Sequence, residues 1–218
     1  MIIKDNTKIA RSFTVSDWKE LRNNLPIDEN PNNKNWHKAF KIFTLRVKSR
    51  FLNPIDAILK LYPRKGKGEG FSVVALQCIL IEFFEAFYEG KIYYPKLDKN
   101  ALERKSKKLD ITVEELEKFV QPNGYSSSAS LFKNFLNREP FNGIKRKIRD
   151  EFFGNFRCGL LHEASTKDSA IIRTKKKVGD NTLMEPEEGN IILYRTPFQR
   201  ELKKYLKNTK RNSCLHLN

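Results

Sequence analysis

The sequence predicts a mainly α-helical bundle with a small C-terminal β-hairpin and a final helix. Apolar residues recur at steps of three or four along several segments, as in helices with one buried side. Residues 71–88 are apolar nearly all round, which is typical of the central helix of a bundle. Residues 169–173 and 190–194 are short apolar runs around a loop containing Lys and Gly, and this pattern indicates a hairpin over residues 166–196.

The length and composition allow one buried core. The chain has 218 residues, of which 39% are hydrophobic, and sixteen are phenylalanine. We expect one helical domain over residues 36–206, an N-terminal extension over residues 1–35 and a disordered tail over residues 207–218.

The first elements are predicted from caps and periodicity. A short helix over residues 14–24 would be capped by Thr14 or Ser16. After a polar loop, a long helix would cover residues 36–52, and Asn53 would cap the next helix. The apolar side of the long helix would consist of Phe40, Phe43, Val47 and Phe51.

Residues 64–70 (RKGKGEG) form a basic, glycine-rich turn. The segment does not match a phosphate-binding nucleotide loop, because no Gly-Lys-Ser/Thr sequence closes it and no strand precedes it. We interpret it as a loop in which Lys65 and Lys67 contact a backbone phosphate. Farther along, residues 91–140 are predicted to be an insertion of short helices around residues 113–119 and 128–137.

A long amphipathic pattern follows Pro140, a residue that suits the first turn of a helix. It leads to Arg157 and His162, which would lie about 140° apart on a regular helix. Either Gly159 loosens the turn or a second copy of the chain completes the site. The apolar stripe of this helix consists of Phe141, Ile144, Ile148, Phe152, Phe156 and Leu160.

Arg157 and His162 are the candidate catalytic residues. Arginine is a permanent planar cation that neutralises a phosphoryl group, and histidine exchanges protons near neutral pH. Glu163 would tune the proton affinity of His162, and the alternative is that His162 is an ordinary histidine at a helix end. Of the other two histidines, His37 is more typical of a surface position and His216 lies in the tail.

Three glutamates lie on one polar side of the predicted helix 71–88. Glu82, Glu85 and Glu89 would form a solvated edge or pair with Arg46 or Arg50. In the functional interpretation, Glu82 orients Arg157 or His162.

Other chemistries have no matching motif. No pair of histidines has zinc-ligand spacing, and no acidic cluster suggests a two-metal nuclease. A serine-hydrolase elbow and a dinucleotide fingerprint are also missing from the sequence. We therefore expect no metal and no cofactor.

The segment Arg157-Cys158-Gly159-Leu160-Leu161-His162 resembles the signature of the HEPN family, in which four to six residues separate an arginine from a histidine. The family comprises helical ribonucleases and RNA-binding proteins, including toxins, anticodon nucleases and CRISPR-associated domains. Residues 68–72 and the apolar helix after them are also similar to bacterial proteins with this segment, so the resemblance covers residues 36–206. It implies a HEPN-like bundle and a homodimer with a composite cleft. Many active members have a polar residue after the arginine, where this chain has Cys158.

The charge of the chain points to a polyanion as partner. The formal net charge is +16, and the excess of basic residues is spread along the sequence. The alternative is a basic protein from a Lys-rich genome without a nucleic-acid ligand. Candidate RNA contacts, besides Lys65 and Lys67, are Arg149 and the run Lys175, Lys176 and Lys177, which could equally be a solvated hairpin tip.

We expect a cytoplasmic protein. The three cysteines have no metal-like spacing, no apolar run reaches the length of a membrane span, and the N-terminus does not resemble a signal peptide.

The expected function is a metal-independent endoribonuclease, in which the 2′-hydroxyl group of RNA attacks the adjacent phosphate. The resemblance places such an enzyme in a toxin or antiphage defence setting, with an antitoxin or defence-system protein as partner. One alternative is a non-catalytic RNA-binding or assembly protein with the same fold, which Cys158 favours. Another is a regulatory DNA-binding protein.

Overall fold

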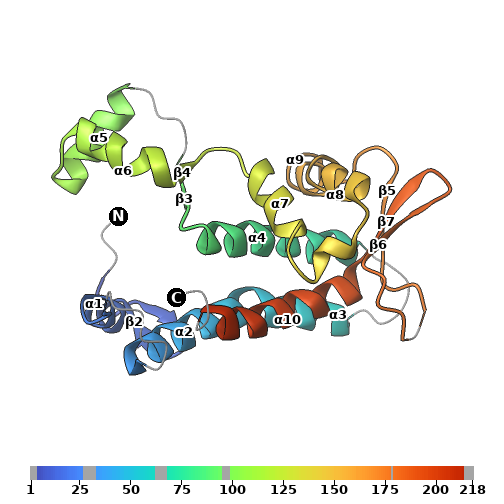
Figure 1. The fold of residues 1–218 in the computed structure, drawn as a ribbon, viewed down its shortest axis with the longest axis horizontal. Coiled ribbons are helices and arrows are strands. Elements are labelled where there is room, and N and C mark those ends of the chain that lie inside the picture. The colour runs from blue at the N-terminus through green and yellow to red at the C-terminus, as the bar shows by residue number, and fades with distance from the viewer. Residues whose placement is uncertain (1–3, 27–32, 62–67, 95–98, 178, 214–218) are drawn as a thin grey trace. The chain divides into compact units, whose positions relative to one another are not determined.

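The computed structural model describes residues 4–26, 33–61, 68–94, 99–177 and 179–213. The chain forms two compact units in place of the predicted single domain over residues 36–206. The first unit combines Met1–Gln77 with Ser169–Asn218, and the second unit comprises Cys78–Asp168. Both units are mainly helical, which confirms the predicted class (Figure 1).

The N-terminal residues belong to the core of the first unit. Strand β1 (Lys8–Ala10) pairs antiparallel with β2 (Phe13–Thr14), and helix α1 (Val15–Asn23) follows directly. As predicted, the Thr14 side chain caps this helix. Apolar side chains of these elements, which lie in the predicted N-terminal extension, pack against those of the next helix. The buried members of this cluster are Ala10, Leu21, Ala39 and Ile42.

The predicted helix 36–52 is present, but it begins earlier and does not stop at Asn53. Helix α2 (Lys34–Val47) continues through a π-helical turn, η1 (Lys48–Leu52), into α3 (Asn53–Leu61). Asn53 has helical backbone angles of φ −67° and ψ −44°, so it continues the helix instead of capping a new one. On α2 and η1, Ala39, Ile42, Val47 and Leu52 are buried, whereas the three predicted phenylalanines are half-buried.

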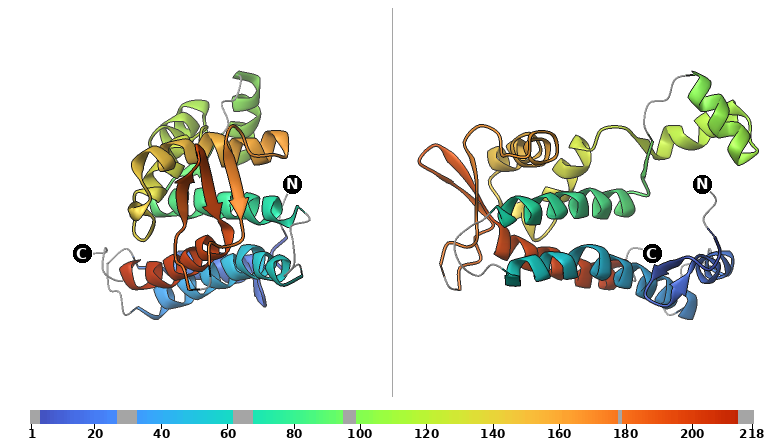
Figure 2. Two further views of the ribbon diagram at one scale, coloured as in Figure 1. Left: turned by 90° about the vertical axis from the view of Figure 1, so that its right-hand side faces the viewer. Right: turned by 180° about the vertical axis from the view of Figure 1, so that it is seen from behind.

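A three-stranded sheet replaces the predicted two-stranded hairpin. The strands β5 (Ala170–Arg173) and β7 (Asn190–Tyr194) are parallel, and β6 (Met184–Glu187) pairs antiparallel with β7 (Figure 2). The real hairpin joins β6 to β7 through Glu188 and Gly189, which have φ of 50° and 80°. Two successive residues with positive φ match the right-handed twist of paired strands, and this Glu-Gly signal was not part of the sequence prediction.

The final helix is longer than predicted. Helix α10 (Arg195–Ser213) includes Pro197 in its first turn and buries Phe198 and Leu202. The predicted disordered tail is wrong for residues 207–213, because no glycine or proline interrupts the helix after Leu206. Residues 214–218, which include His216, lie outside the described residues.

A buried ion pair connects the start of α10 to the helix that begins at Glu69. The Nη2 atom of Arg195 lies 2.7 Å from the Glu69 carboxylate, and both side chains are less than a tenth exposed. Gln77 also donates a hydrogen bond to the carbonyl oxygen of Arg195, at 2.9 Å. A Cβ atom on Gly70 would lie 2.6 Å from the Arg195 guanidinium, so this close approach requires glycine.

Helix α4 (Glu69–Tyr88) begins in the first unit and ends in the second. It confirms the helix predicted over residues 71–88. By length and composition it could cross a membrane, but 56% of its most apolar window is buried inside the protein. This burial is typical of a core helix.

The second unit contains the predicted short helices and one more. Strand β3 (Ile92–Tyr93) pairs in parallel with β4 (Gly124–Tyr125). The first of the intervening helices was not predicted from the sequence, because it is strongly polar. The helices of this region are α5 (Lys99–Leu109), α6 (Val113–Asn123) and α7 (Ala129–Leu136).

The helix predicted from Pro140 is broken into four pieces. After a single 3₁₀ turn, η2 (Phe141–Gly143), the chain is extended at Ile144 and the main helix begins only at Arg146. The predicted apolar stripe is confirmed, because all six of its residues are buried. Aromatic rings dominate this core: Phe132 packs on Phe152 at 6.0 Å between ring centroids, and Phe152 packs on Phe156 at 5.3 Å. The remaining pieces are α8 (Arg146–Phe152), a π-helical segment η3 (Phe153–Cys158) and α9 (Gly159–Glu163).

Candidate active site

Arg157 and His162 lie side by side in one copy of the chain. The Arg157 Nη1 atom is 3.4 Å from the His162 Nε2 atom. A regular α-helix would separate the two side chains, but Arg157 belongs to the π-helical segment η3. His162 belongs to α9, so the two side chains meet across the junction of η3 and α9.

The chain after α9 folds back against η3. Ala164 ends α9 with a left-handed backbone, φ 53°, and the Lys167 amide then donates a 2.9 Å hydrogen bond to the Asn155 carbonyl. Gly159 has ordinary helical angles, φ −56° and ψ −52°, so the prediction that it loosens the helix is wrong. A Cβ atom there would lie 2.5 Å from the Ser165 carbonyl oxygen. Gly159 therefore permits the close return of the chain.

Glu82 contacts Arg157, as the functional interpretation of the α4 glutamates predicted. Its Oε2 atom lies 3.5 Å from Arg157 Nη2, and each side chain is 20% exposed. The guanidinium also lies over the Phe153 ring, 5.3 Å from its centroid. These contacts limit the directions in which the guanidinium can point.

Tyr125 is a member of the site that was not predicted from the sequence. Its hydroxyl group donates a 3.2 Å hydrogen bond to Glu82, and its ring packs edge-on against Tyr93, 5.6 Å between centroids. Burial, followed by the negative charge of Glu82, raises the pKa of Tyr125 to about 12. No sequence signal marks this residue, because it lies 43 positions from Glu82 on a two-residue strand.

The two cysteines near Arg157 differ in environment. Cys78 is completely buried on α4, and burial raises the pKa of its thiol. Cys158, which follows the arginine, is half-buried in η3.

Glu163 forms an ion pair with a lysine, and within the described part of the chain it forms no ion pair with His162. Its carboxylate lies 2.5 Å from Lys167 Nζ. This contact raises the pKa of Lys167, mainly through the hydrogen bond that the ammonium group donates. The position of Glu163 gives no support to the predicted tuning of His162.

Glu85 of α4 and Glu89, which directly follows α4, do not form a solvated edge. Glu85 is completely buried and accepts bidentate hydrogen bonds from Arg138, the shortest at 2.6 Å. Burial raises the pKa of Glu85, and the contact with Arg138 acts in the opposite direction. Glu89 accepts a 2.7 Å hydrogen bond from Asn134. These glutamates stabilise the second unit, whereas Glu82 faces the candidate catalytic pair.

Two predicted arginines have contacts away from this pair. Arg149 donates a 2.9 Å hydrogen bond to the carbonyl oxygen of Asn142, which ties α8 to the preceding turn. Arg50 belongs to the first unit, where its Nη2 atom lies 3.5 Å from the carbonyl oxygen of Ile9.

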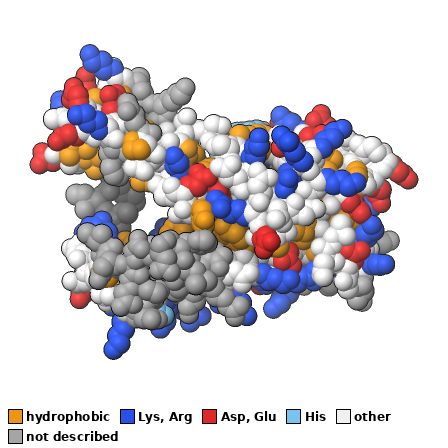
Figure 3. Space-filling model, in the orientation of Figure 1, with side chains coloured by type: hydrophobic (Ala, Val, Ile, Leu, Met, Phe, Trp, Pro, Cys, Tyr) orange, Lys and Arg blue, Asp and Glu red, His pale blue; other side chains and the backbone are white. Residues whose placement is uncertain are grey.

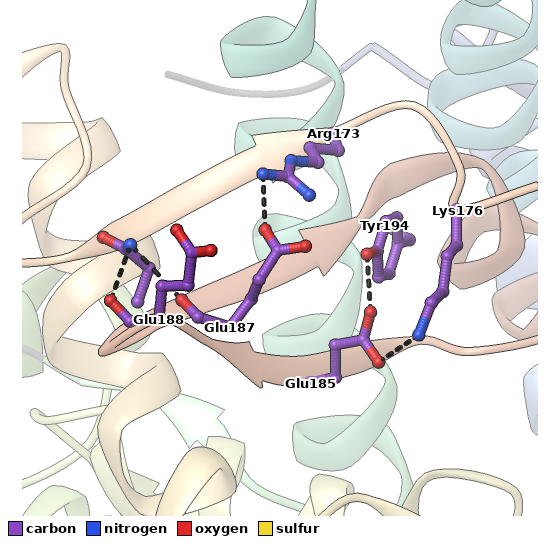
Figure 4. A network of polar contacts seen from close by, with 7 residues as sticks. Arg173, Lys176, Glu185, Glu187, Glu188 and Tyr194 are labelled. Carbon is purple, nitrogen blue, oxygen red and sulfur yellow. Dashed lines mark hydrogen bonds and ion pairs between the residues drawn. The ribbon is translucent and has the colours of Figure 1, made fainter.

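The lysine run predicted to bind RNA follows β5. Lys176 forms a 2.7 Å ion pair with Glu185, which also accepts a hydrogen bond from the Tyr194 hydroxyl group (Figure 4). Lys175 and Lys177 are exposed. Lys65 and Lys67 lie outside the described residues. Pairing within the sheet reduces the availability of Lys176 for a phosphate.

Within the described part of the chain, no group of three or more His, Cys, Asp and Glu residues could hold a metal ion. Comparison of the chain with protein-family models, with curated proteins and with solved structures finds no significant match. The arrangement of side chains is therefore the basis for a functional proposal.

Proposed function

We propose that this protein is a HEPN-type endoribonuclease that cleaves RNA without a metal ion. The observation that carries the proposal is the 3.4 Å approach of Arg157 and His162. Arg157 supplies a fixed positive charge and His162 exchanges protons. The two side chains are close enough to contact the same phosphodiester group.

The approach of the two groups suggests an order of events. For Arg157 Nη1 to donate a hydrogen bond, His162 Nε2 must carry its lone pair. A phosphate oxygen is a stronger acceptor, so bound RNA takes over the guanidinium and leaves Nε2 available as a base. His162 then removes the proton of the 2′-hydroxyl group.

The chemical step needs no further reactant. The 2′-oxygen attacks the adjacent phosphorus and the bond to the 5′-oxygen breaks, while Arg157 stabilises the negative charge that develops on the phosphoryl oxygens. The departing 5′-oxygen takes a proton from His162 or from water. The products are a 2′,3′-cyclic phosphate and a 5′-hydroxyl end.

Glu82 and Tyr125 act as positioning residues in this proposal. Glu82 holds the guanidinium from the α4 side, and Tyr125 holds Glu82. Neither residue is required to exchange a proton with RNA.

Exposed apolar residues near the pair support a homodimer. Leu161, next to His162, is 42% exposed, and Ile79 on α4 is 41% exposed. A second copy would cover such residues and bring two catalytic pairs into one cleft. We also propose a cytoplasmic location and a toxin or defence role with a regulating partner protein.

The test is RNA cleavage in excess chelator by the wild-type protein and by the Arg157→Ala and His162→Ala variants. Wild-type cleavage that leaves 2′,3′-cyclic phosphate ends, with loss of at least about 100-fold in each variant, is expected. Equal cleavage by all three proteins would refute the assignment, and a requirement for magnesium would indicate a different nuclease.

A non-catalytic RNA-binding protein is the second candidate. The observation that favours it is Cys158, a half-buried residue at a position where many active family members have a polar one. RNA binding without cleavage, in both the wild type and Cys158→Asn, would support this candidate.

A further inference from the structure

The two units differ sharply in net charge. The first unit has 26 Lys and Arg against 12 Asp and Glu, a net charge of +14, whereas the second has 16 against 14, a net charge of +2. Figure 3 shows acidic and basic side chains interspersed over α5 and α6 of the second unit. The positive charge that was predicted to be spread along the chain is therefore concentrated in the first unit, which does not contain Arg157 or His162.

The first unit also has a groove between two helical segments. The groove has a volume of about 830 Å³ and lies between α2–η1–α3 on one side and α10 on the other. Its basic residues are Lys41 and Lys48 from the first side and Lys203 and Lys207 from α10, all exposed. Phe40 and Leu45, both half-buried, contribute apolar surface.

Most of the lysine charge in the groove is not neutralised by the protein. Lys203 lies 2.5 Å from Asp56, the acidic residue of the groove lining. Among the described residues, Lys41, Lys48 and Lys207 have no ion-pair partner. Four lysines and one aspartate leave a net charge of +3, which attracts an anion with several charged groups.

The combination of charge and apolar surface fits single-stranded nucleic acid. Its phosphates would contact the lysines, and its unpaired bases would lie on apolar and aromatic surface. A duplex keeps its bases stacked inside, so it would use the lysines but not the surface of Phe40 and Leu45. The spacing of Lys203 and Lys207, about 6 Å along α10, allows both to contact one strand.

We propose that this groove binds single-stranded RNA outside the scissile phosphate. The identity of the ligand rests on the proposed function, whereas the location and charge of the groove do not. Lys41, Lys48 and Lys207 contact phosphates, and the side chains of Phe40 and Leu45 contact bases. Substrate binding and cleavage are thus divided between the two units of the chain.

The test measures binding of a short fluorescent single-stranded RNA by the full chain carrying His162→Ala, which prevents cleavage. Lys41→Glu combined with Lys48→Glu should weaken binding about tenfold or more at moderate salt. A plot of the logarithm of the association constant against the logarithm of the salt concentration should become less steep by about 1 to 1.5, because two phosphate contacts are lost. Circular dichroism establishes that the variant is folded.

The matched control is Lys34→Glu combined with Lys118→Glu. Both lysines are exposed, neither lines the groove, and the net charge changes by the same amount. The control should weaken binding less than about threefold. An equal effect in the two double variants would overturn the proposal, as would unchanged affinity in the groove variant.

Competition identifies the occupant. Unlabelled single-stranded RNA should displace the probe better than the corresponding duplex or an acidic peptide such as polyglutamate. Displacement at least as effective by the duplex or by the peptide would overturn the proposal. If the wild type binds RNA through the groove but cleaves none, the inference stands and the proposed function fails. If the wild type cleaves RNA but the groove variant binds RNA with unchanged affinity, the proposed function stands and the inference fails.

Discussion

The Lys167 amide donates a hydrogen bond to the Asn155 carbonyl oxygen, and this contact holds the returning chain against the π-helical segment that positions Arg157. The distance is 2.9 Å. The geometry of the candidate active site therefore depends on residues that do not themselves touch the Arg157–His162 pair.

Gly159→Ala tests this dependence. The added methyl group would lie 2.5 Å from the Ser165 carbonyl oxygen, a backbone atom that cannot move without shifting the chain. We expect the free energy of unfolding to fall by about 1–3 kcal/mol and RNA cleavage to decrease. Denaturant unfolding measures the first effect.

Gly154→Ala is the matched control, because Gly154 lies in the same π-helical segment and a Cβ atom there would meet no neighbouring atom within 4 Å. Its stability should stay unchanged or rise by up to about 1 kcal/mol. Similar losses of stability in both variants would show that the close return of the chain at Gly159 does not cause the destabilisation.

Glu82→Gln should lower the pKa of Tyr125 from about 12, because the charge of Glu82 contributes to its elevation. Removal of a neighbouring negative charge favours the tyrosinate anion. Ionisation of tyrosine is followed by ultraviolet absorbance as the pH is raised. Subtraction of the titration of Tyr125→Phe separates the signal of Tyr125 from that of the other six tyrosines. Glu89→Gln, which removes a carboxylate directly after the end of α4, should leave the titration unchanged. An identical titration in Glu82→Gln and the wild type would rule out the Glu82–Tyr125 contact.

Glu85→Ala should destabilise the second unit by about 2–4 kcal/mol. The substitution removes a completely buried carboxylate and breaks its ion pair with Arg138, whose side chain is only 29% exposed. Asp150→Ala breaks an exposed pair with Arg146 at 3.7 Å and should cost less than about 1 kcal/mol. Thermal unfolding compares the two, and equal shifts of Tm would contradict the assigned role of Glu85.

The cap of α1 should make stability depend on pH. Hydrogen bonds from Thr14, the backbone one first, lower the pKa of Asp17 below its ordinary value of 3.8. The stabilisation is therefore present above 3.8 and is lost as the pH falls through the lower folded-state pKa. The difference in unfolding free energy between the wild type and Asp17→Asn should shrink over this acidic range. A difference that is constant with pH would contradict the expectation.

The sequence by itself determined the helical class and the core stripe from Phe141 to Leu160, and it narrowed the cap of α1 to Thr14 or Ser16. Each depends on local periodicity or on a hydrogen bond between residues a few positions apart, so each can be read without knowing the fold. The motif Arg157 to His162 was likewise evident from its residue types.

Only the tertiary structure decided which of these residues contact one another. Arg157 Nη1 lies 3.4 Å from His162 Nε2 across the junction of η3 and α9, although regular helical geometry predicted their separation. The parallel pairing of β5 with β7 and the contact of Tyr125 with Glu82 also join residues distant in sequence. Periodicity describes one element at a time, whereas contacts between elements depend on the packing of the complete chain.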